Sequence, residues 1–216
     1  LPEVTISELT PRKRRFFLKY LARFLLLFES VKAKGSFLDN KRVIVTAAPH
    51  QSGKDEYLMI LMILALDIDV CYLSAKWTMR RIPIPFIKPK DIDNQGIPWP
   101  LGWLQEIVFR KFGAIPVDRK GNSGQYDSVV QELLKRDSFL LIITPEGRFD
   151  ATRFRSSFLY LAKELEAEVM PVQIDYEHDT LQFLGSLNLD GSEDEVIQRL
   201  RICFDGVKGR KSRFKA

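Results

Sequence analysis

The chain has 216 residues, 45% of them hydrophobic and 28% charged, a composition that supports one folded domain and excludes global disorder. Its two cysteines, Cys71 and Cys203, lie far apart inside apolar runs, which excludes a disulfide framework or a zinc-ligand pattern and fits a reducing compartment. The net charge of +5 is uneven, because residues 1–35 and 206–216 each carry +5 and leave −5 for residues 36–205. No RNA-binding or helix-turn-helix motif accompanies the basic ends, so a nucleic-acid partner is not expected.

The first predicted element is a basic amphipathic helix within residues 11–32. It opens with a proline, which suits the first turn of a helix, and it contains no glycine. Two sets of side chains recur at spacings of three and four residues, one basic and one apolar: Arg12, Arg15, Lys19 and Arg23, and Phe17, Leu21, Phe24, Leu25 and Phe28. The two sets therefore form two different faces of one helix.

This helix has the character of a segment that lies in a membrane interface. Its longest unbroken apolar run, residues 24–28, is far shorter than the roughly 20 residues needed to span a bilayer. We expect residues 1–35 to associate with anionic lipid at the cytoplasmic face of a membrane, assisted by the basic tail 206–216. The alternative is a surface helix that packs its apolar face on the rest of the protein.

Between residues 36 and 205, short apolar runs alternate with helical patterns. Strands are expected over 43–48, 70–75, 114–117, 139–144, 169–175 and 180–185, and helices over 53–66, 101–112, 124–136, 153–166 and 193–203. A proline-rich stretch, residues 81–100, is expected to be a long loop. This alternation predicts a single α/β domain with a mostly parallel central sheet and helices on both faces.

Three polar side chains come shortly after predicted strands of this sheet: His50, Arg119 and Glu146. In open α/β sheets, ligands bind beyond the carboxyl ends of the strands. These three residues are therefore the first candidates for a functional site.

His50 precedes Asp55 by five residues in the stretch AAPHQSGKDEY. The two side chains can meet if His50 lies in the turn before a helix and Asp55 lies in its first turn. Asp55 also has a purely structural interpretation, because Ser52 and Asp55 resemble the capping box of a helix. The stretch differs from a phosphate-binding Walker loop at two of four fixed positions, and the G-x-S-x-G elbow of serine hydrolases does not occur. The imidazole therefore needs a hydroxyl on the substrate as its proton donor.

Two further segments, GAIPVDRK (113–120) and TPEGR (144–148), end predicted strands with charged side chains and glycines. An arginine presents a planar fork to phosphate, and backbone N–H groups in a glycine-containing turn add further donors. The alternative is a pair of turns with solvated charges.

Together these segments resemble the glycerophospholipid acyltransferases, including 1-acylglycerol-3-phosphate acyltransferases, in order and spacing across residues 43–185. The first family block, H-x-x-x-x-D, is matched by His50 and Asp55. The later blocks are matched by Gly113, Pro116, Asp118 and Arg119, by Pro145, Glu146, Gly147 and Arg148, and by the strand proline Pro171. The third block departs from the family pattern, because it begins with Thr144 and lacks a threonine between the glycine and the arginine.

The resemblance implies an acyltransferase domain over residues 36–205. His50 is then the general base that accepts a proton from the acceptor hydroxyl, and Asp55 orients the imidazole. The other expected substrate-binding residues are Arg119 and Arg148 for phosphate, Glu146 for a glycerol hydroxyl, and Gly113, Gly147 and Lys76 beside them. We also expect the His50 ring to stand open at the edge of the sheet, facing the same hollow as the guanidinium groups.

The implied reaction transfers a fatty acyl group from acyl-CoA or acyl carrier protein to a lysophospholipid, without a cofactor or a metal. An apolar trough for the acyl chain is expected within residues 77–104, which contain Trp77, Phe86, Trp99 and Trp103. Two alternatives stay open: a peripheral lipid-binding protein without turnover, and a lipid ester or thioester hydrolase.

Overall fold

The computed structural model describes residues 3–6, 8–11, 16–76, 78–82, 97–98, 100–117, 125–146 and 153–210. The chain forms two compact units, one built from residues 1–70 and 137–216 and the other from residues 71–136. Within the part that is described, no helix has the length and apolar character required to cross a membrane.

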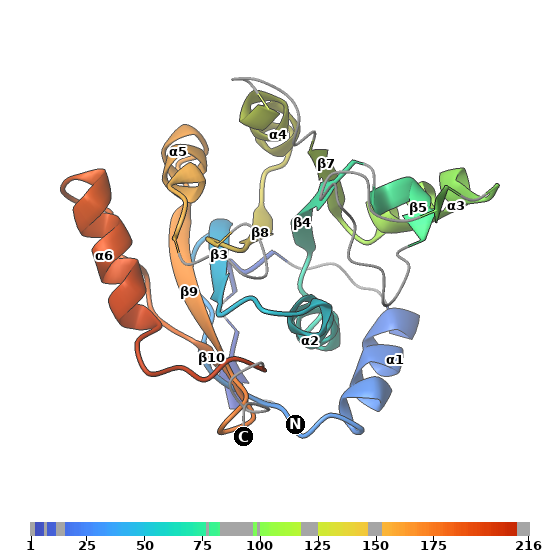
Figure 1. The fold of residues 1–216 in the computed structure, drawn as a ribbon, viewed down its shortest axis with the longest axis horizontal. Coiled ribbons are helices and arrows are strands. Elements are labelled where there is room, and N and C mark those ends of the chain that lie inside the picture. The colour runs from blue at the N-terminus through green and yellow to red at the C-terminus, as the bar shows by residue number, and fades with distance from the viewer. Residues whose placement is uncertain are drawn as a thin grey trace. The chain divides into compact units, whose positions relative to one another are not determined.

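The larger unit is built on a sheet with the strand order β1-β2-β10-β9-β3-β8 (Figure 1). These strands are β1 (Glu3–Thr5), β2 (Lys32–Ser36), β3 (Arg42–Ala48), β8 (Phe139–Ile143), β9 (Glu168–Asp175) and β10 (Thr180–Phe183). Every neighbouring pair is parallel except β10 and β9, which are antiparallel. The expected α/β class with a mostly parallel sheet is confirmed.

Helices cover both faces of this sheet. Side chains alternate between the two faces of a strand, so Val43 and Val45 of β3 point to the same face. There they pack in the core with Leu58 and Met62 of α2 (Gly53–Ala65). The opposite face carries α5 (Ser157–Glu164), which contacts β3, and α6 (Glu193–Cys203), which contacts β9 (Figure 1). The β3 strand is therefore buried on both sides, which explains its continuous apolar sequence.

The amino-terminal helix α1 (Phe16–Leu26) contacts α2, and two side chains of its basic face bind the end of that helix. Lys19 forms an ion pair with Asp67, and the Arg23 Nε donates a hydrogen bond of 3.1 Å to the Ala65 carbonyl. Both partners lie at the carboxyl end of α2, where exposed carbonyls and the helix dipole attract cations. Lys19 and Arg23 therefore attach α1 to the protein.

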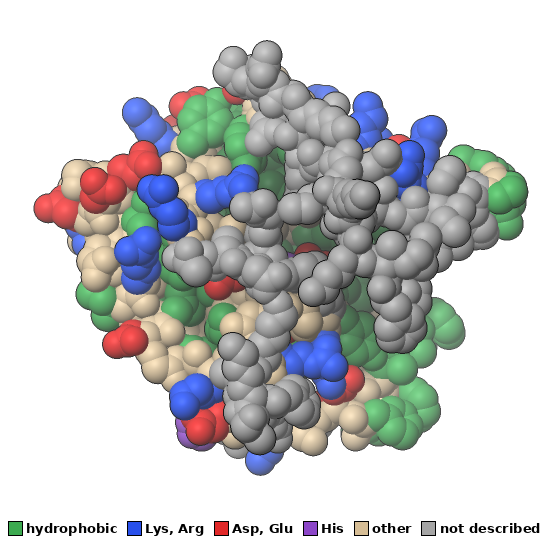
Figure 2. Space-filling model, in the orientation of Figure 1, with side chains coloured by type: hydrophobic (Ala, Val, Ile, Leu, Met, Phe, Trp, Pro, Cys, Tyr) green, Lys and Arg blue, Asp and Glu red, His purple; other side chains and the backbone are tan. Residues whose placement is uncertain are grey.

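Most apolar side chains of α1 point away from the protein, and Figure 2 shows hydrophobic side chains at the surface where this helix lies. Its exposed side chains are Phe16, Phe17, Tyr20, Leu21 and Phe24, and the following turn adds Leu27 and Phe28. Phe17, Leu21, Phe24 and Phe28 of the predicted apolar face are thus exposed, whereas Leu26 packs against the core.

The smaller unit pairs β4 (Val70–Ala75) with β7 (Ala114–Val117) in parallel. Its helical elements are α3 (Gly102–Lys111), α4 (Gln125–Leu134) and the 3₁₀ turn η1 (Thr78–Arg80). The predicted proline-rich loop contains two short antiparallel strands, β5 (Arg81–Ile82) and β6 (Ile97–Pro98). Of the aromatic residues expected to form an acyl trough, Trp103 is exposed on α3, and Trp77, Phe86 and Trp99 lie outside the described residues.

The strand β2 requires a glycine at position 35. Gly35 adopts a φ of 101°, and a Cβ at this position would lie 2.1 Å from the Phe183 carbonyl oxygen of β10. This distance is far shorter than a van der Waals contact. The β10 strand cannot move away easily, because it is hydrogen-bonded to both β2 and β9.

Replacing Gly35 by alanine is therefore expected to lower the free energy of unfolding by about 2–3 kcal/mol, from the strained φ and the overpacking together. Urea unfolding followed by circular dichroism measures this change. Gly185→Ala is the matched control, because a Cβ at Gly185 meets no atom within 4 Å. Equal stability of the two variants would contradict the close approach of β2 and β10.

Candidate active site

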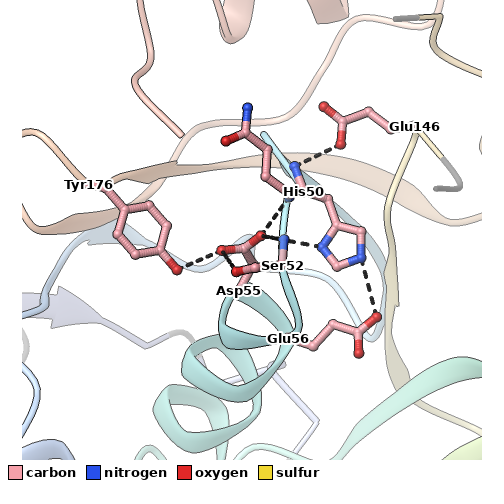
Figure 3. Close-up of polar contacts among 7 residues, drawn as sticks. His50, Ser52, Asp55, Glu56, Glu146 and Tyr176 are labelled. Atoms are coloured by element: carbon pink, nitrogen blue, oxygen red, sulfur yellow. Dashed lines mark hydrogen bonds and ion pairs between the residues drawn. The ribbon is translucent and has the colours of Figure 1, made fainter. Parts of the chain in front are cut away.

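His50 lies just beyond the end of β3, in the turn that leads into α2 (Figure 3). Its Nδ1 atom is 3.7 Å from Asp55 Oδ2, and its Nε2 atom is 3.3 Å from Glu56 Oε1. The imidazole therefore lies between two carboxylates from the first turn of α2. The residue is only 4% exposed, so the expectation of a ring standing open at the edge of the sheet is wrong.

The Asp55 carboxylate is held by four donors (Figure 3). Its Oδ2 accepts the backbone N–H groups of Gln51 and Ser52, both at 2.7 Å. Its Oδ1 accepts the Ser52 hydroxyl at 3.2 Å and the Tyr176 hydroxyl at 2.6 Å. Asp55 is 1% exposed, and these donors offset the cost of burying its charge.

Asp55 thus has the structural function of satisfying the N–H groups that precede α2. Its distance of 3.7 Å from the imidazole nitrogen exceeds that of a hydrogen bond, but it is short for two charges. The Asp55 carboxylate therefore caps the amino terminus of α2 and also places a negative charge beside the His50 ring.

Tyr176 follows β9 and was not among the residues expected from the sequence. Burial and the neighbouring Asp55 carboxylate raise the pKa of the Tyr176 phenol, so the hydroxyl remains a donor at neutral pH. Its backbone N–H donates to the Lys208 carbonyl at 2.9 Å, which attaches the carboxyl-terminal segment to the site.

Glu146 follows β8 and contacts the backbone rather than the ring of His50. Its Oε2 accepts the His50 N–H at 2.7 Å, which ties the ends of β3 and β8 together. Burial raises the pKa of Glu146, and the hydrogen bond from His50 opposes that shift. Glu146 therefore positions the turn that carries the imidazole, a function that the sequence did not suggest.

The remaining candidates fall into two groups. Lys76 and Gly113 belong to the smaller unit, where Lys76 N–H donates to the Val117 carbonyl at 3.0 Å and Gly113 adopts a φ of 96°. Arg119, Gly147 and Arg148 lie outside the residues that the structure describes. The structure thus brings together His50, Asp55 and Glu146, and it adds Glu56 and Tyr176.

An imidazole beside a buried carboxylate, at the carboxyl end of a parallel strand, can serve as a general base once Nε2 carries a lone pair. Residues 100–175 match the model of the Acyltransferase family. The resemblance to acyltransferases is therefore confirmed over this stretch, and the match supports a general acyltransferase function. His50 and Asp55 precede the matched residues. No curated protein sequence matches the chain.

Proposed function

We propose that this protein transfers a fatty acyl group from an acyl thioester to the free hydroxyl of a lysophospholipid such as 1-acylglycerol-3-phosphate. The observation that carries the proposal is the His50 imidazole beside the buried Asp55 carboxylate. The acyltransferase match over residues 100–175 supports the same reaction class. The donor is acyl-CoA or acyl carrier protein, and the reaction needs no cofactor.

In the proposed reaction, His50 Nε2 accepts the proton of the acceptor hydroxyl. The hydroxyl oxygen forms a bond to the thioester carbonyl carbon, the carbon–sulfur bond breaks, and the thiolate leaves with the proton from Nε2. The ring carries a positive charge between these two proton transfers, and the Asp55 carboxylate beside Nδ1 stabilises that charge. General-base assistance of this kind contributes about 10²- to 10⁴-fold in rate.

Phosphate recognition is assigned to arginine side chains that follow two of the strands. Arg119 and Arg148 hold the acceptor phosphate through their planar guanidinium groups, with Lys76 as a third cation. Gly113 and Gly147 are assigned to the same binding role, because a glycine allows a ligand to approach backbone N–H groups closely. Glu146 accepts the His50 N–H through one carboxylate oxygen, and we assign the binding of a glycerol hydroxyl to its other oxygen.

A second candidate function is lipid binding without turnover. The burial of His50 favours it, because a ring that is 4% exposed offers little surface to a substrate. The two functions differ in whether an acyl group is transferred.

The decisive experiment incubates the purified protein with radiolabelled acyl-CoA and a panel of lysophospholipids, and it measures labelled phospholipid and labelled free fatty acid. Labelled phospholipid supports the transferase. Labelled fatty acid without phospholipid identifies a hydrolase. Vesicle binding without either product identifies the lipid-binding protein.

We also propose that the exposed apolar face of α1 rests on an anionic membrane surface at the cytoplasmic side. A contiguous apolar patch of this kind marks an interaction site. Residues 12–15, which directly precede α1, are all basic, and the tail 206–216 carries five more basic side chains. Their charge complements anionic lipid, whereas the aromatic side chains supply the apolar contact.

Replacing Phe17 and Phe24 together by serine is expected to lower vesicle binding on the order of a hundredfold, about tenfold for each phenyl group withdrawn from lipid. Co-sedimentation with vesicles of mixed neutral and anionic lipid measures the binding. Ile202→Ser is the control, because Ile202 is an exposed apolar residue on α6. Unchanged binding of the double variant would remove α1 as the membrane contact.

A further inference from the structure

The Glu56 carboxylate lies beside Nε2 of His50, the ring nitrogen that acts as the base in the proposed reaction. Its Oε1 lies 3.3 Å from His50 Nε2, and its side chain is 59% exposed (Figure 3). Glu56 follows Asp55 directly in α2, so the two carboxylates leave the first turn in different directions. Asp55 points into the protein beside Nδ1, whereas Glu56 reaches Nε2 from the solvent side.

The Glu56 carboxylate influences the protonation of Nε2. A carboxylate only accepts hydrogen bonds, so an oxygen 3.3 Å from Nε2 favours a ring with a proton on that nitrogen. The described charged groups that face His50 are Asp55 and Glu56 from α2 and Glu146 from the segment after β8. All three are carboxylates, which accept hydrogen bonds and donate none. A general base requires the opposite state, with a lone pair on Nε2.

We propose that Glu56 keeps Nε2 protonated in the resting protein, and that the Glu56 carboxylate takes up this proton and leaves with it when the acceptor hydroxyl takes its place. The lone pair on Nε2 is then free, and His50 acts as the base. Since the ring is almost fully buried and Glu56 is mostly exposed, the carboxylate is the movable partner. Rotation of an exposed side chain is fast compared with enzyme turnover. Glu56 is thus a positioning residue that sets the protonation of His50, and this assignment rests on the proposed function.

A direct test follows the two histidines of the chain, His50 and His178, by NMR of the imidazole groups as the pH is varied. In Glu56→Gln, the amide still reaches Nε2 but carries no charge, and it can donate to the lone pair. We expect the ring signals to show less proton on Nε2 of His50 in this variant than in the unaltered protein, because the acceptor that faces Nε2 has lost its charge. His178 is paired with Asp175 at 2.6 Å and is expected to titrate as in the unaltered protein.

Glu193→Gln is the matched control, because Glu193 is an exposed carboxylate in the first turn of α6. This control is expected to leave His50 unchanged. An unchanged His50 titration in Glu56→Gln would overturn the inference. Because the NMR measurement requires no turnover, an inactive protein would refute the proposed function without affecting this result.

The pH dependence of kcat/KM provides a second test. The acid limb of the kcat/KM profile is expected to move to lower pH in Glu56→Gln by the same amount as the NMR titration, with less change in the alkaline limb. A variant that loses activity equally at every pH would show that Glu56 supports the fold rather than the proton, and it would overturn the assignment.

Discussion

Replacing His50 by alanine is expected to lower the rate of acyl transfer by about 10²- to 10⁴-fold, the range that a general base contributes. The loss should appear in kcat, because the imidazole acts on the proton in the transition state rather than on the bound lipid. The radiolabelled acyl-CoA assay measures it on the lysophospholipid that the unaltered protein prefers. Retention of the full rate would show that another group removes the proton.

Two controls separate chemistry from folding in this experiment. His178→Ala removes an exposed imidazole that contacts Asp175, and it should leave turnover unchanged. His50→Gln preserves most of the side-chain volume at a buried position, so a loss of rate in a variant with native thermal stability assigns the effect to the base.

Asp55→Ala is expected to lower the free energy of unfolding by about 3–5 kcal/mol, as for the loss of one partner from a buried charged network. The substitution leaves the N–H groups of Gln51 and Ser52 and the Tyr176 hydroxyl without their shared acceptor. Buried donors without a partner are costly, which makes this the largest expected effect on stability. Urea unfolding measures the change.

Tyr176→Phe removes one of these donors and is expected to cost about 1.5–3 kcal/mol, the usual value for a hydrogen bond to a charged group. Asp205→Asn, an exposed position, serves as the neutral control. If Asp55→Ala were as stable as Asp205→Asn, the hydrogen bonds that converge on Asp55 would contribute nothing to the fold.

The strands that carry the site were predictable because each is buried on both faces. The apolar run of β3 appears in the sequence as VIVTAA, and those of β8 and β9 are equally plain. In contrast, β2 has the sequence KAKGS, in which only Ala33 is buried. Its pairing with β10 depends on residues far along the chain, and no local periodicity reveals it.

The site was predictable where its residues are close in sequence. The spacing of His50 and Asp55, together with Ser52 as a helix start, correctly placed the imidazole beside the first turn of α2. Tyr176 was missed because β9 brings it to Asp55 from 121 positions away. The burial of His50 could not be predicted either, because it depends on residues that are distant in the sequence and pack around the side chain in the fold.

The orientation of α1 shows the same limit. The two faces of the helix were visible in the sequence, but the pattern does not state which one meets the protein. Asp67 and the Ala65 carbonyl at the end of α2 decide this, because they bind Lys19 and Arg23. Two of the four cations on the predicted basic face, Lys19 and Arg23, thus bind the end of α2.

The pairing of β2 with β10 sets an order for folding during synthesis. Lys32 lies opposite Thr180, and Gly35 lies opposite Phe183. A ribosome adds about 5–20 residues per second, so β10 is synthesised roughly ten seconds after β2. The strands β1 and β2 are therefore synthesised early, but they join the rest of the sheet only after β10 has been made.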